Sequence, residues 1–153
     1  MTKTQTRAHC QICGREQAVV KGRMSKHGYT VEHGWFNGVC SGEHFAPVEV
    51  SREETDKMVA SIRMQVAAMR AEADAFEAGE ITPDFVTREV GREKTQIAFA
   101  DAYAWEKESA VKRAVWARRS RANQGDQHCD MMIAIANRYH GQEVKVVEQA
   151  APP

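Results

Sequence analysis

This chain of 153 residues has only four prolines and 7% aromatic residues, and it contains no long apolar run. No window approaches the ~18 consecutive apolar residues that suggest a transmembrane helix, so we expect no membrane span. The first eight residues are polar and lack the apolar core of a secretory signal, which favours a cytoplasmic location. In that reducing compartment, the four cysteines are better interpreted as metal ligands or free thiols than as disulfides.

The chain also lacks net charge, because 21 basic residues balance 21 acidic ones. This balance argues against a protein coated in positive charge for nucleic-acid binding. The charges are nevertheless unevenly placed: residues 51–81 carry seven acidic and four basic side chains, and residues 82–125 carry six acidic and nine basic ones. Such alternation is typical of helices that pack together through complementary faces.

The most informative local pattern is the pair Cys10 and Cys13, separated by two residues and followed by Gly14. This spacing forms a turn that presents both sulfurs to one metal ion, and a structural zinc ion needs four such ligands. Cys40 is the only further thiol nearby, because Cys129 lies in the distant helical region. A glycine-rich segment of this size cannot bury a large core, so a metal would act as its staple.

The fourth ligand would come from the histidines of the same segment, which are His9, His27, His33 and His44. His9 adjoins Cys10 and would strain the turn, whereas His27 lies midway between the cysteines at the start of a predicted strand. The site that we favour consists of Cys10, Cys13, His27 and Cys40. His44, four residues after Cys40, is the main alternative to His27.

Three other interpretations of these residues carry less weight. The cysteines would be ordinary thiols if the histidines were scattered surface residues. A redox pair normally lies between a strand and a helix in a βαβ unit, and no such pattern is visible. Catalytic zinc requires an open coordination position and a general base, and the deaminase order of His-x-Glu before Pro-Cys-x-x-Cys is reversed here. We therefore predict structural zinc and no enzymatic activity.

Composition divides the chain into a zinc-binding module at residues 1–50, a helical and coiled-coil-like region at 51–148, and a disordered tail at 149–153. Short strands are predicted at 18–20, 29–31 and 35–36. Ser51 and Glu54 fit a capping box at the start of a helix. Apolar residues then recur at spacings of three and four, which predicts a packing seam formed by Met58, Ile62, Val66, Met69, Ala73 and Phe76.

Two further helices are predicted after this one. Thr82 and Pro83 resemble a helix start, and we expect that helix to reach about Asn123 and to end at Gly125. A third helix is expected from Asp126 to His140, followed by an extended segment at 143–147. The sequence thus predicts an α+β protein, with a small zinc-stapled, β-rich N-terminal module followed by an antiparallel helical hairpin and a third helix.

A basic stretch that also contains tryptophan lies within the second predicted helix. Its candidate contact residues for a partner or a nucleic acid are Trp105, Lys112, Arg113, Trp116, Arg118, Arg119 and Arg121. Cations beside an aromatic ring can bind phosphates and stack on bases, or they can bind an acidic protein surface. A solvated face, with the tryptophans packed on the acidic helix, is the simpler alternative.

The segments 10–15, 27–30 and 35–42 together resemble a group of small, largely uncharacterised bacteriophage and prophage proteins with a helical C-terminal region. The resemblance implies zinc binding through the matching Cys10, Cys13, His27 and Cys40. A phage origin would place the protein in the host cytoplasm and make a host protein its partner, as an inhibitor or modulator. We expect this non-enzymatic role, with self-association through the helices. The alternative is a nucleic-acid-binding zinc-finger protein.

Overall fold

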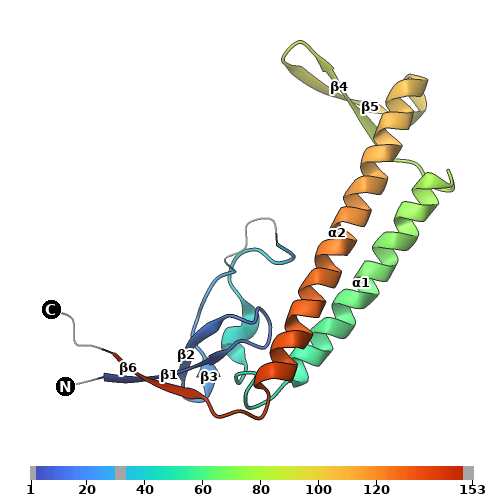
Figure 1. Ribbon diagram of the computed structural model, residues 1–153. Helices are drawn as coiled ribbons and strands as arrows, with labels where there is room; N and C mark the ends of the chain where they lie inside the picture. Colours follow the sequence, from blue (N-terminus) through green and yellow to red (C-terminus); the bar gives the residue numbers. More distant parts are fainter. Residues whose placement is uncertain (1–2, 30–33, 150–153) are drawn as a thin grey trace. The chain divides into compact units, whose positions relative to one another are not determined.

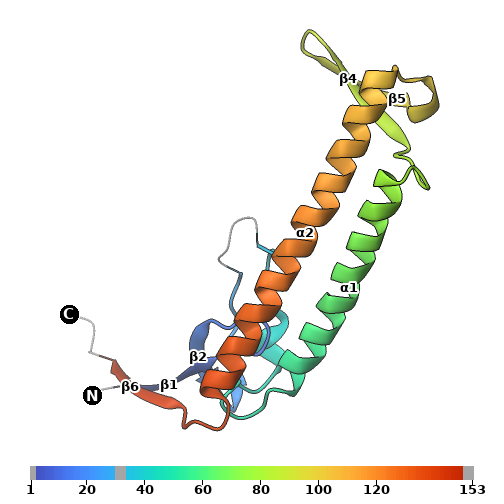
Figure 2. The same cartoon turned by 45° about the vertical axis from the view of Figure 1, so that its right-hand side comes forward.

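The computed structural model describes residues 3–29 and 34–149, and the structural statements below concern these residues. The chain forms two compact units, one from Met1–Arg63 with Gln124–Pro153 and the other from Met64–Asn123. Two long helices, α1 (Glu53–Glu77) and α2 (Ala104–Tyr139), contribute to both units (Figures 1 and 2). No helix in the described part of the chain is long and apolar enough to cross a membrane.

The first unit, which we call the N-terminal unit, contains an antiparallel sheet with the strand order β3-β2-β1-β6. Its strands are β1 (Lys3–His9), β2 (Glu16–Val20), β3 (Arg23–Met24) and β6 (Lys145–Gln149). The strand predicted at 18–20 lies within β2, whereas residues 35–36 form no strand. Residues 30–33, including part of the strand predicted at 29–31, lie outside the described chain, as do residues 150–153 of the predicted tail.

One core cluster of the N-terminal unit is built around cysteines, beside buried aliphatic residues such as Val48 and Ile62. Cys10, Cys13 and Cys40 are buried together with Ile12 and Met24. A short 3-10 helix, η1 (Ser41–His44), directly follows Cys40. In this unit the first turns of α1 pack on the last turns of α2, where the Cys129 Sγ lies 3.8 Å from the Val59 carbonyl oxygen.

The start of α1 is capped by a residue from the cysteine turn. The backbone amides of Glu54 and Thr55 donate to Gln11 Oε1, at 2.9 and 3.4 Å, and the Thr55 hydroxyl donates to the Gln11 carbonyl at 2.8 Å. Ser51 Oγ accepts from the Glu53 amide, and the Glu54 carboxylate pairs with Lys57. The cap therefore ties the helix to the cysteine turn over a long sequence distance.

The second unit, the hairpin unit, contains the end of α1, the start of α2 and a β-hairpin between them. Strands β4 (Phe85–Val90) and β5 (Glu93–Ala98) pair antiparallel and lead into the 3-10 helix η2 (Phe99–Asp101). Gly91 opens their two-residue loop with a φ of 65°, a conformation that favours glycine at the first position of a type II′ turn.

The predicted helix start at Thr82 is therefore wrong, because a β-hairpin occupies residues 85–98. Val86 and Ile97, which fall within the predicted helix, face each other in the register of this hairpin. β-branched residues are frequent here and suit extended backbone. Val86 packs with Ala102 and Ala110 in a small core, so one face of the hairpin gains a buried side chain.

The predicted third helix is also wrong as a separate element, since α2 runs without interruption from Ala104 to Tyr139. Gly125 does not end the helix, although an internal glycine costs about 1 kcal/mol relative to alanine. Gly125 is buried, as are Ala122 and Cys129 one turn to either side, so packing along this face outweighs its low helix propensity. The described chain thus contains two α-helices where the sequence predicted three.

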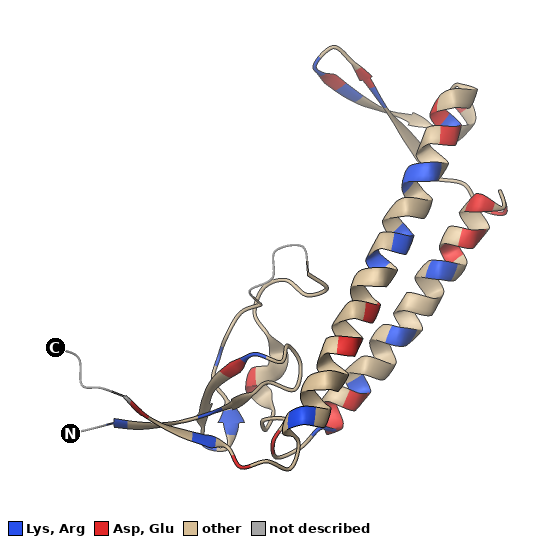
Figure 3. Ribbon diagram, in the orientation of Figure 1, with Lys and Arg blue, Asp and Glu red and all other residues tan. Residues whose placement is uncertain are grey.

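In the hairpin unit, the apolar seam of α1 faces α2. Ala73 and Phe76 are buried with Val115, while the flanking charges form ion pairs between the helices. Arg118 Nε lies 2.7 Å from a Glu72 carboxylate oxygen, and Arg119 pairs with both Asp74 and Glu77. Figure 3 colours the basic positions of α2 and the acidic positions of α1 on the ribbon. The alternation of acidic and basic segments in the sequence corresponds here to pairing between neighbouring helices.

Candidate metal centre

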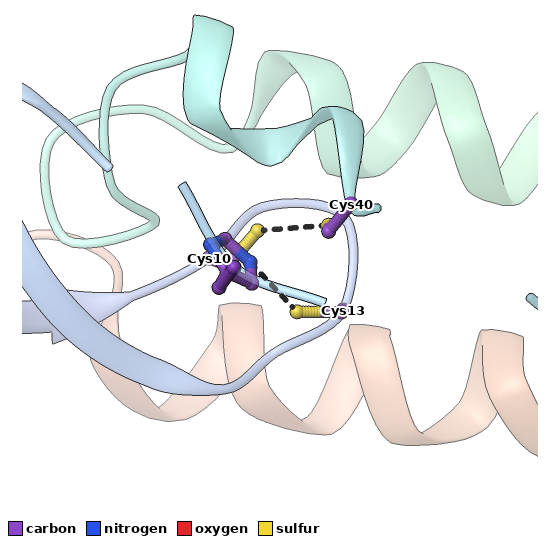
Figure 4. Close-up of side chains that lie close together, drawn as sticks. Cys10, Cys13 and Cys40 are labelled. Atoms are coloured by element: carbon purple, nitrogen blue, oxygen red, sulfur yellow. Dashed lines mark hydrogen bonds between the residues drawn. The ribbon is translucent and has the colours of Figure 1, made fainter. Parts of the chain in front are cut away.

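Four buried side chains converge at the centre of the N-terminal unit. Their ligand atoms, which belong to Cys10, Cys13, His27 and Cys40, all lie within 4.8 Å of one another. The Cys10 and Cys40 sulfurs are 3.7 Å apart, and the Cys13 sulfur lies 3.2 Å from His27 Nε2. Figure 4 shows the three sulfurs pointing into the same space. The structure thus brings together the four residues that we favoured from the sequence, and the group can hold a metal ion.

Two turns supply the thiols. After Cys10 the chain folds back so that the Gly14 amide donates to the Cys10 carbonyl at 2.9 Å, and the Ile12 amide points at the Cys10 sulfur at 3.3 Å. After Cys40 the chain enters η1, and the Gly42 amide points at the Cys40 sulfur at 3.4 Å. Amide dipoles of this orientation favour the thiolate form, which is the form that binds metal.

Because Gly42 has no side chain, the sulfurs of Cys10 and Cys40 have room beside it. A Cβ at this position would collide with the Cys10 sulfur and would lie 3.3 Å from the Cys40 sulfur. The backbone at Gly42 does not have a positive φ, so its lack of a side chain matters for space rather than for conformation. The second turn therefore depends on glycine because it closes directly over the cluster.

The imidazole of His27 is oriented by a backbone contact. Its Nδ1 lies 2.7 Å from the Ser25 carbonyl oxygen, an arrangement in which Nδ1 donates and Nε2 faces the sulfurs as an acceptor. Metal-bound histidines usually make such a second contact, which fixes the ring and its tautomer. The segment is held by the Cys40 amide, which donates to the His27 carbonyl at 2.9 Å. His27 thus presents the correct nitrogen to the cluster.

The three thiols influence one another strongly because they are close together and buried. Hydrogen bonding from Cys10 and Cys13 lowers the pKa of Cys40, whereas the neighbouring sulfurs of Cys10 and Cys40 and burial raise the pKa of Cys13. Without a cation the cluster accordingly favours one thiolate and disfavours a second. A bound divalent ion would supply the positive charge that lets all three sulfurs ionise.

The remaining candidate histidines have other environments. His44 has a side chain that is 68% exposed, and its Nε2 lies 3.7 Å from the carboxylate of its neighbour Glu43. His9 is buried and uses Nδ1 to contact Glu49 at 2.6 Å, while its ring stacks on Tyr139. His33 lies outside the described residues. His27 is therefore the histidine that the structure places in the cluster.

The candidate contact residues of the basic stretch all lie on α2, but their exposure and their ion pairs differ. Trp105 and Trp116 are 69% and 72% exposed, so they do not pack on the acidic helix. Arg118 and Arg119 pair with acidic residues of α1, and Lys112 pairs with Glu108. Arg113 is exposed, and Arg121 is half-buried. These cations are for the most part already matched within the chain.

Sequence reasoning missed the residues that support the cluster. Gln11 carries no ligand atom, and nothing in its local sequence indicates that it caps a helix 43 residues later. Tyr29, whose pKa is raised by burial and by its hydrogen bond to Cys40, was recognised only as a strand residue. The sequence did indicate a role for Gly42, which follows Cys40 by two residues, because a glycine also follows Cys13.

Comparison of the chain with protein-family models, with curated proteins and with solved structures gave no match. The resemblance to bacteriophage proteins accordingly stays a prediction, and the function has to be argued from the site and the surfaces of the molecule.

Proposed function

We propose that this chain is a zinc-stabilised binding protein, without enzymatic activity, whose hairpin unit contacts a partner protein. The observation that carries the metal assignment is the buried group of three cysteines and one histidine. Four ligands from the protein complete a tetrahedral zinc site, and such closed sites are structural, because catalytic sites keep a position for water.

The spacing of the ligand atoms suits zinc. Zn–S bonds of about 2.3 Å in a tetrahedron place two sulfurs about 3.8 Å apart, and the Cys10 and Cys40 sulfurs are 3.7 Å apart. Thiolate-rich sets with imidazole are typical of zinc, whereas calcium and magnesium prefer oxygen ligands. When bound, the ion would neutralise the thiolates and hold β1, η1 and the His27 segment together.

The surface of the hairpin unit supports the binding role. Six large hydrophobic side chains among its described residues are more than half exposed: Met64, Phe85, Val90, Tyr103, Trp105 and Trp116. Exposed tryptophan and tyrosine are typical anchors of protein interfaces. Self-association through the helices was also expected, but Ala73 and Phe76 of the apolar seam pack with Val115 of the same chain, so the proposal needs no second copy. Following the resemblance, we propose a protein of the bacterial host as the partner.

A nucleic-acid ligand has less support, because Arg118 and Arg119 are already paired with carboxylates of α1. Phosphate binding would have to break these pairs, and it would weaken steeply as salt increases. Protein contacts through exposed aromatic rings require no such exchange.

Capture from bacterial lysate tests the proposal. Zinc-loaded chain on a resin is expected to retain a distinct protein after nuclease treatment, and the double variant Trp105→Ala/Trp116→Ala is expected to lose it. The matched control Trp35→Phe alters a buried tryptophan and should keep the capture. Retention of nucleic acid alone, or of the same proteins by the double variant, would contradict a protein-binding role for these side chains.

A further inference from the structure

Both outer edges of the β4–β5 hairpin lack a strand partner in the described part of the chain. Within the described chain β4 pairs as a strand only with β5, and the two strands form a separate two-stranded sheet. Each strand therefore has one edge of backbone donors and acceptors without a strand partner. Exposed edges of this kind are templates for the addition of another strand.

The register identifies which backbone groups of β4 face outward. A two-residue loop at Gly91 and Arg92 makes Val90 and Glu93 a hydrogen-bonded pair, and bonded and non-bonded pairs then alternate along the strands. The alternation of bonded and non-bonded pairs continues past the strands, where the Phe99 amide donates to the Asp84 carbonyl at 3.1 Å. The backbone groups that point away from β5 consequently belong to Phe85, Thr87 and Glu89.

A groove follows this strand. Its volume is about 810 Å³, and all six residues of β4 line it, together with the first turns of α2. Since alternate residues of a strand face opposite sides, a groove that touches all six runs along the backbone rather than over one face. Tyr103 and Trp105 border it with side chains that are 61% and 69% exposed.

The charges of the groove are matched except for one. Arg88 is bound by both carboxylate oxygens of Glu106, each contact being 2.6 Å, and Lys94 lies 2.7 Å from Glu89. Arg113 also lines the groove and has no acidic partner among the described residues. The groove therefore presents one unmatched positive charge beside two aromatic rings and an open strand edge.

We propose that this groove binds an extended acidic segment of the partner protein, which adds to β4 as a third strand. The outward backbone groups of β4 would supply the hydrogen bonds, and Tyr103 and Trp105 would contact apolar side chains at alternate positions. Arg113 would pair with a carboxylate. This inference rests on the proposed protein-binding function and assigns it a site and a class of ligand.

A designed peptide tests the inference directly. The probe is a peptide of about eight residues, long enough to span β4, in which valine or phenylalanine alternates with glutamate. We expect it to bind the full zinc-loaded chain in calorimetry at least tenfold more tightly than the same peptide with lysine in place of glutamate. The variant Arg113→Glu should reverse that preference. Equal binding of both peptides, or no binding, would overturn the proposal.

Matched proline substitutions test the strand edge. Thr87→Pro removes an outward amide of β4, whereas Gln96→Pro removes the outward amide of the opposite residue on β5. The first change should weaken the acidic peptide at least tenfold and the second should leave it unchanged. Circular dichroism tests whether both variants fold. If either does not, Trp105→Ala, which alters the groove, is compared with Trp116→Ala, which lies outside it, and only the first should weaken the acidic peptide. Equal effects within a pair would contradict edge addition.

The same variants separate this inference from the proposed function. If Thr87→Pro and Trp105→Ala still capture protein from lysate but Trp116→Ala does not, the chain binds a protein through a surface other than the β4 groove. A chain that captures no protein at all would reject the proposed function itself.

Discussion

Gly42 and Gln11 show how single residues that bind no metal shape the candidate metal centre. Gly42 leaves room for the Cys10 sulfur, and Gln11 links the cysteine turn to the start of α1. Both lie in the buried part of the N-terminal unit. Changes at these positions should therefore have effects that differ in kind, one on metal affinity and one on helix stability.

Gly42→Ala is expected to lower the affinity for zinc roughly tenfold to hundredfold, as loss of a supporting contact around a metal commonly does. The added methyl group would occupy space held by the Cys10 sulfur and force the second turn away. Competition with a chromophoric chelator measures the change. Ser41→Ala, at the exposed neighbouring position, is the control and should bind zinc as the original chain does. Equal affinities for all three proteins would contradict the close packing at Gly42.

Gln11→Ala should reduce the free energy of unfolding by about 1–2 kcal/mol, because the first amides of α1 lose their acceptor. Urea unfolding of the zinc-loaded chain measures this change, and metal analysis should give the original zinc content. Gln127→Ala, at an exposed position of α2, serves as the control. A cost no greater than that of the control would show that the cap is not required.

At the scale of elements, the hairpin is held to α2 by one well-defined ion pair. Arg88 contacts both oxygens of Glu106 and lies 4.6 Å above the ring of Tyr103, whose amide donates to Glu106 at 2.8 Å. The hydrogen bonds from Arg88 lower the pKa of Glu106 to about 2. The pair thus connects the β4 strand to the first turn of the helix.

The attachment of the hairpin should therefore depend on pH in a defined window. Because the pKa of Glu106 is lower in the folded chain than its ordinary value of about 4.5, the pair stabilises the fold above that value and is lost as the pH falls towards 2. Hydrogen exchange of the Tyr103 amide should accelerate, relative to its intrinsic rate, over this range. In Glu106→Gln the acceleration should be present already at neutral pH.

Glu108→Gln is the matched control for this experiment, since Glu108 is an exposed acid on the same helix that pairs with Lys112. It should leave the exchange of the Tyr103 amide unchanged. A carboxyl of Glu106 that titrates near 4.5, followed by carbon-detected NMR, would show that the ion pair does not hold the hairpin.

The elements also show what the sequence could and could not reveal. The spacing of Cys10 and Cys13 predicted that their sulfurs meet, because that turn geometry is local, and the choice of Cys40 and His27 followed from the few other thiols and imidazoles in the segment. The helix expected from Thr82 failed since apolar residues such as Val86 and Ile97 satisfy a helical stripe and a paired strand equally well. Gly125 was taken as a stop because its burial, which outweighs its low helix propensity, is not visible in the local sequence. The role of Gln11 was hidden for the same reason.

At the scale of the whole molecule, the chain combines a unit whose core contains the cysteine cluster with a unit whose core is a pair of helices. The N-terminal unit buries three of its cysteines where an ordinary core would place larger side chains. The hairpin unit has an apolar core of its own around Phe76 and Val115. We therefore expect metal removal to disrupt the N-terminal unit first.

Trp35 is a natural reporter for this difference. It is 7% exposed and lies in the N-terminal unit, whereas the other two tryptophans of the chain are in the hairpin unit and exposed. Replacing both by phenylalanine, as Trp105→Phe/Trp116→Phe, leaves Trp35 as the only tryptophan. Its emission then reports the fold around the cysteine cluster and little else.

The most direct test of the central claim is a zinc titration of this single-tryptophan chain, followed by metal analysis and Trp35 emission. We predict about one zinc ion per chain, a red shift of the emission when a chelator removes the metal, and recovery when zinc returns. The variant Cys40→Ser should show the red-shifted spectrum and lose the recovery. A metal-free chain that keeps the blue emission of a buried Trp35 would contradict the account.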